Sequence, residues 1–76
     1  MLPSFVIRLE RINHLIQTKA TGNPRQLSNR LNISERSLYE YMAVLKEMGA
    51  PIQYDRHRET YFYNEGTLFS LRFQKS

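Results

Sequence analysis

Four polar residues within one short stretch carry the side chains best suited to recognising another molecule: Arg36, Ser37, Tyr39 and Glu40. A guanidinium presents paired donors, a hydroxyl donates or accepts, and a carboxylate accepts. Arginine pairs bidentately with guanine, and a carboxylate accepts from the cytosine amino group, so these groups could read DNA base edges. We interpret Arg36 as the best base reader, with Ser37 and Tyr39 reaching bases or phosphates. The alternative is a solvated face on which Arg36 pairs with Glu35 or Glu40.

A second cluster, Arg56, His57 and Arg58, lies in a polar segment between two short runs of apolar and aromatic residues. Flexible cations at such a position can contact phosphates or enter a minor groove without sequence-specific geometry. The alternative is an ordinary soluble loop, because Asp55 and Glu59 neutralise part of its charge. We predict contact with a nucleic-acid backbone.

Arg25 and Gln26 follow Asn23 and Pro24 at the expected start of a helix. Exposed N–H groups and the helix dipole favour a phosphate there, so both residues are candidates for DNA contact. Gln26 can also serve as the capping partner of Asn23, which makes Arg25 the safer candidate.

Two helices joined by a tight turn must position these side chains. An Asn-Pro-x-Gln start signal opens the first helix, predicted over 23–32. Asn32 tolerates the left-handed conformation of a sharp turn, and Ser34 caps the second helix, predicted over 34–48. Apolar residues at steps of three and four give this helix one buried stripe, opposite its four polar residues, and Gly49 ends it.

Further elements flank this pair. An amphipathic helix is predicted over 4–19 and is closed by residues 21–22. Two short β-type runs around the polar loop predict a hairpin over 52–63, and a strand with one apolar face is predicted over 67–73. Three helices followed by a hairpin describe an α+β winged helix-turn-helix fold, whose wing is the hairpin, with a possible extra C-terminal strand.

Three sequence features resemble a known family: Arg8-Leu-Glu-Arg-Ile12, Leu31-Asn-Ile-Ser-Glu-Arg-Ser37, and Leu45-Lys-Glu-Met-Gly-Ala-Pro-Ile52 leading to Tyr61-Phe-Tyr63. Together they resemble the N-terminal DNA-binding domain of DeoR-like and WYL-domain bacterial transcription regulators. The resemblance covers Arg8 to Tyr63 and implies the winged-helix fold and the binding of double-stranded DNA.

The chain departs from this family in two ways. Those regulators usually continue past the wing into an effector-binding domain, whereas only one further strand is expected here. They typically carry basic residues and then an aspartate where this chain has Tyr39-Glu40-Tyr41, and a carboxylate facing the groove repels phosphates unless it accepts from cytosine.

Composition excludes several functions for this chain of 76 residues, expected to be one domain over 1–76. The absence of cysteine excludes disulfides and thiol catalysis. A net charge of +4 favours an anionic partner. The apolar run 1–7 is too short to span a membrane and lacks a basic leading region, so we expect a cytoplasmic protein. His14 has no acid or nucleophile that would complete a catalytic pattern, and the sequence has no glycine-rich phosphate loop. We therefore expect no enzyme activity and no site for a metal, a cofactor or a small molecule.

The aromatic residues of the third helix and the hairpin have two interpretations. Tyr41, Tyr54, Tyr61, Phe62 and Tyr63 could stack on unpaired bases. Core packing is the preferred interpretation, because so small a chain needs these rings to cover its helices.

These observations predict sequence-specific binding of double-stranded DNA, by a small transcriptional regulator or a phage or mobile-element accessory factor. Phe69, Leu71 and Phe73 form the apolar face of the last predicted strand, which either joins the wing sheet or pairs with a second subunit. We expect a homodimer, because one such module makes few DNA contacts. The alternative is a winged-helix protein-interaction or assembly module that uses Tyr39, Tyr41 and this strand.

Overall fold

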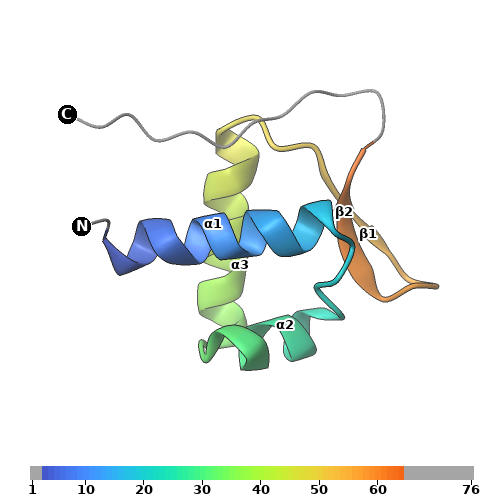
Figure 1. Cartoon of the computed structure of the whole chain (residues 1–76), viewed down its shortest axis with the longest axis horizontal. Helices are drawn as coiled ribbons and strands as arrows, with labels where there is room; N and C mark the ends of the chain where they lie inside the picture. Colours follow the sequence, from blue (N-terminus) through green and yellow to red (C-terminus); the bar gives the residue numbers. More distant parts are fainter. Residues whose placement is uncertain (1–2, 65–76) are drawn as a thin grey trace.

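The computed structural model describes residues 3–64, which form a winged helix (Figure 1). Helix α1 crosses α3, α2 packs beside α3, and the two-stranded hairpin packs against α1. The predicted α+β winged-helix fold is confirmed. The predicted strand 67–73 lies outside the described residues. The elements are α1 (Ser4–Gln17), α2 (Pro24–Leu31), α3 (Glu35–Glu47), β1 (Ile52–Asp55) and β2 (Thr60–Tyr63).

The core lies where the three helices meet. All its members except Ala50, which follows α3, come from helical stripes at three- and four-residue spacing. They are Leu9, Ile12, Ile16, Leu27, Leu31, Leu38, Tyr41, Met42, Leu45 and Ala50. Burying one large apolar side chain contributes about 1.5–3 kcal/mol, so this cluster is the main source of stability. No helix within residues 3–64 is long and apolar enough to cross a membrane.

The first turn of α1 extends beyond this core. The sequence pattern places Phe5 in the apolar stripe of α1, yet its side chain is 45% exposed. It stacks on Tyr41, with the ring centroids 4.9 Å apart. Ile7 is also exposed. Helical spacing identified the correct face of α1, but the core begins only at Leu9.

The two helices of the predicted motif begin at the expected caps. The Gln26 N–H donates to Asn23 Oδ1 at 2.8 Å, and the Asn23 N–H donates to Gln26 Oε1 at 2.9 Å, so the predicted capping box is present. The Ser37 N–H donates to Ser34 Oγ at 3.0 Å. These bonds satisfy N–H groups that lack partners within the helices.

All three helices end in the same way. A left-handed residue follows each one, Lys19 at φ 55°, Asn32 at φ 56° and Gly49 at φ 99°, and the next N–H bonds to the carbonyl five residues back. The predicted stops at Asn32 and Gly49 are confirmed. The first helix was predicted over 4–19 and closed at 21–22, which is wrong, because the left-handed turn at Lys19 ends α1 at Gln17.

Replacing Lys19 by glycine is expected to raise the free energy of unfolding by about 0.5–1 kcal/mol. A left-handed residue with a Cβ costs about 1–2 kcal/mol, partly offset by the extra unfolded-chain entropy of glycine. Urea unfolding followed by circular dichroism measures the change. Lys19→Ala is the control, since alanine keeps the Cβ. An equal gain from alanine would trace the effect to the lost lysine side chain instead.

The hairpin is fixed to the α1–α2 connection by a buried pair of threonines, Thr21 and Thr60, which are 0% and 4% exposed. Their hydroxyl oxygens lie 3.0 Å apart. The Tyr61 N–H donates to Thr21 Oγ1 at 2.8 Å, and the Thr21 N–H donates to Thr60 Oγ1 at 3.2 Å. These bonds satisfy the Tyr61 N–H on β2 and the Thr21 N–H before α2, and they attach the wing to the α1–α2 connection.

Candidate nucleic-acid interface

The exposed side of α3 carries the polar residues predicted to recognise DNA. Arg36, Tyr39 and Glu40 are exposed and Ser37 is half-buried, while the apolar stripe of the same helix is buried. Residues three and four apart lie on the same side of a helix. The polar residues at such spacing from Arg36 therefore share one side of α3, and the buried apolar residues share the other. This side of α3 is therefore open to a partner.

Arg36 and Glu40 form an ion pair along the helix, with Arg36 Nε 3.8 Å from Glu40 Oε1. Both side chains are largely exposed, 92% for Arg36 and 71% for Glu40. A pair of this kind contributes only about 0.3–0.5 kcal/mol. The pairing predicted as the alternative is therefore present, but it is too weak to prevent Arg36 from reaching a base.

Two further candidates are engaged within the protein without using all their hydrogen-bonding groups. Ser37 Oγ accepts from the Ser34 hydroxyl at 3.1 Å, which leaves the Ser37 hydroxyl its own proton to donate. The Gln26 side-chain oxygen is used in the capping box, so only its amide N–H groups remain for a phosphate. Arg25 is exposed in the first turn of α2.

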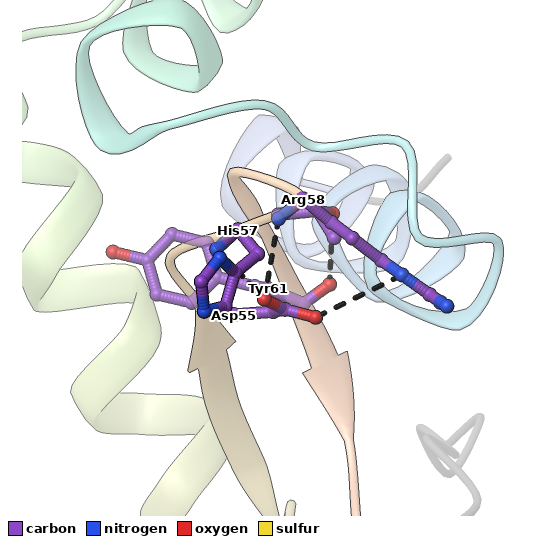
Figure 2. A network of polar contacts seen from close by, with 5 residues as sticks. Asp55, His57, Arg58 and Tyr61 are labelled. Atoms are coloured by element: carbon purple, nitrogen blue, oxygen red, sulfur yellow. Dashed lines mark hydrogen bonds and ion pairs between the residues drawn. The ribbon is translucent and has the colours of Figure 1, made fainter.

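The wing tip is organised by Asp55 (Figure 2). Its Oδ1 accepts from the His57 N–H at 2.9 Å and the Arg58 N–H at 3.2 Å, and its Oδ2 lies 3.9 Å from Arg58 Nε. The Arg58 N–H is the largest cause that lowers the pKa of the Asp55 carboxyl; desolvation opposes it, and the His57 N–H and nearby positive charge reinforce it. Arg56, His57 and Arg58 are exposed. The turn therefore holds the three predicted contact residues at the end of the wing.

The contact segments 25–26, 35–40 and 55–59, which contain the nine predicted contact residues together with their acidic neighbours, have no net charge. Four arginines in them are matched by four acidic residues, so the net charge of +4 lies elsewhere in the chain. Neighbouring carboxylates therefore offset part of the attraction between these arginines and phosphates. The placement of individual groups, including uncharged donors, then matters more than it would on a uniformly cationic surface. The residues are Arg25, Arg36, Arg56 and Arg58 against Glu35, Glu40, Asp55 and Glu59.

Comparison with known protein families identifies the fold. Residues 8–62 match the family described as an HTH domain, from the first helix to the second strand of the wing. The chain belongs to this helix-turn-helix family. Comparisons with curated proteins and with solved structures give no match. Membership confirms the predicted helix-turn-helix domain and supports DNA as the partner of this HTH protein.

Proposed function

We propose that this HTH protein binds double-stranded DNA sequence-specifically in the cytoplasm, as a small transcriptional regulator or a phage or mobile-element accessory factor. The observation that carries the proposal is the polar, exposed side of α3 in a helix-turn-helix fold. An α-helix fits the major groove, where base pairs present distinct donor and acceptor patterns. Helix α3 is the recognition helix, and the wing contacts the flanking backbone.

Each side chain of the interface has a role that follows from its chemistry. Arg36 leaves its weak ion pair and donates two hydrogen bonds to a guanine. Glu40 accepts from a cytosine amino group, while Ser37 and Tyr39 donate to bases or phosphates. Arg25 supports a phosphate at the start of α2, where the helix dipole also favours an anion.

Homodimerisation is part of the proposal. Phe69, Leu71 and Phe73 alternate along one face of the strand predicted from the sequence, outside the described residues. Two recognition helices on a two-fold site double the number of base contacts, and the second contact becomes intramolecular.

A protein-interaction module is the second candidate function. It is favoured by the absence of net charge in the contact segments and by two exposed apolar side chains at the start of α1, Phe5 and Ile7. An apolar interface between proteins would respond little to salt, whereas contact with phosphates responds strongly. Salt dependence therefore distinguishes the two functions.

The test is the affinity of the full chain for an arbitrary duplex, measured by fluorescence anisotropy over a range of salt concentrations. Affinity should fall with salt, with a log–log slope of about 0.9 for each phosphate contacted. Arg56→Ala with Arg58→Ala should weaken binding to all sequences and reduce the slope by up to about 1.8.

The control removes an exposed cation on α1, Arg11, which is not one of the proposed contact residues. Arg11→Ala makes the same change in net charge as either wing substitution alone, and it should leave the slope close to the wild-type value. No binding at low salt, or binding that ignores salt, would contradict the proposed function. An unchanged slope in the wing variant alone would place the wing away from DNA.

A further inference from the structure

The five tyrosines of the chain fall into two groups according to their hydroxyls. Tyr41 Oη accepts from Arg8 Nη1 at 3.4 Å, and the Tyr63 hydroxyl donates to Asn13 Oδ1. The other three hydroxyls have no hydrogen-bond partner within residues 3–64. They belong to Tyr39, Tyr54 and Tyr61, which we call the tyrosine cluster.

The tyrosine cluster lies between the recognition helix and the wing. Tyr54 on β1 is paired with Tyr61 on β2, and their ring centroids are 4.9 Å apart. Figure 2 shows the Tyr61 ring extending from the hairpin towards α3. Burial raises the pKa of Tyr61 to about 12, and the proximity of Tyr39, Tyr54 and Glu35 adds to the shift. Tyr61 therefore stays a protonated donor at neutral pH.

Core packing accounts for these rings but not for their hydroxyls. Tyr54 and Tyr61 are half-buried, and Tyr39 is 52% exposed. Phenylalanine would cover the core equally well, whereas a tyrosine at the edge of a core keeps one polar end for a partner. None of these three hydroxyls is buried without a partner, so solvent can reach them in the free protein, and a ligand can take the place of that solvent.

We propose that the tyrosine cluster binds the sugar–phosphate backbone of the DNA strand that passes between α3 and the wing. This inference rests on the proposed function. With α3 in the major groove and the wing on the flanking backbone, that strand runs across the space between them. The contact segments have no net positive charge, so neutral O–H donors to phosphate oxygens supply contacts that cations do not. Such contacts position the duplex and carry no sequence information.

The test is Tyr54→Phe with Tyr61→Phe in the full chain, because phenylalanine keeps the rings and removes only the hydroxyls. Affinity should fall roughly tenfold for two lost hydrogen bonds, and by the same factor for every duplex. The salt slope should not change, since a neutral donor releases no counterion. Tyr63→Phe is the control, because its hydroxyl is used inside the protein, and its affinity should equal that of the wild type.

Three outcomes would overturn the inference while the wild type still binds duplexes in a salt-dependent way. They are wild-type affinity in the double variant, a loss confined to one sequence, and a flatter salt slope. If the double variant is unfolded by circular dichroism, Tyr39→Phe replaces it, because Tyr39 lies outside the core. That variant should bind all duplexes several-fold more weakly, again with an unchanged slope. Failure of the wild type to bind any duplex would instead overturn the proposed function, and this inference with it.

Discussion

Replacing Thr21 by valine is expected to lower the free energy of unfolding by about 1–3 kcal/mol. Valine has nearly the same shape, so packing changes little. The substitution leaves the Tyr61 N–H without its acceptor at 2.8 Å and removes the contact with the Thr60 hydroxyl at 3.0 Å. A buried donor without a partner loses its hydration and gains nothing in return. Urea unfolding of the full chain, followed by circular dichroism, measures the loss.

Two controls separate the hydroxyl from its surroundings. Thr21→Ser keeps the hydroxyl and removes only a methyl group. It should therefore lower the free energy of unfolding by less than Thr21→Val does. Thr18→Val removes a hydroxyl that bonds two helix carbonyls at an exposed position, and it should have little effect. If the urea midpoint of unfolding of Thr21→Val equals that of the wild type, the threonine pair does not stabilise the wing.

Much of the fold follows from signals a few residues apart. The Asn23 and Gln26 side chains cap the start of α2 because both lie on the same first turn, and any chain with that spacing can form the bonds. Asn32 and Ser34 end one helix and begin the next through their own backbone preferences. Local chemistry of this kind needs no knowledge of the rest of the chain, so it could be predicted from the sequence.

Features that depend on distant residues could not be predicted in the same way. Thr21 and Thr60 are 39 residues apart, and nothing near either one indicates that they meet. Lys19 adopts a left-handed conformation that sequence preference assigns to glycine or asparagine. Phe5 has the right spacing for the core, but how far α1 extends past α3 is decided by tertiary packing.

The candidate site was predictable as a set of residues and not as an arrangement. Helical periodicity placed Arg36 and Glu40 on the open side of α3 and indicated that they could pair. The small size of the chain favoured Tyr54 and Tyr61 as core residues; both are half-buried, and Tyr61 packs against the core. The proximity of Tyr61 to Tyr39 depends on how the hairpin packs against the helices, which no short-range pattern encodes.

Replacing Arg36 by alanine is expected to weaken binding to the preferred site by about 1–3 kcal/mol, because it removes a bidentate contact with guanine. Preference should relax at one base pair and persist at the others. The measurement is the affinity of the full chain for the preferred duplex and for duplexes that each carry one base-pair change. Loss of the weak Arg36–Glu40 ion pair should change the free energy of unfolding by less than about 0.5 kcal/mol.

Glu40→Gln breaks the same ion pair and keeps Arg36. It therefore shows how much of the effect of Arg36→Ala comes from the lost ion pair and how much from the lost base contact. Glutamine also removes a negative charge near the phosphates, so non-specific affinity should rise. Preference should change at a different base pair from the one that Arg36 reads, since the two side chains lie one helical turn apart. If the Arg36→Ala variant binds every duplex more weakly by the same factor, Arg36 contacts a phosphate and reads no base. A backbone contact carries no sequence information.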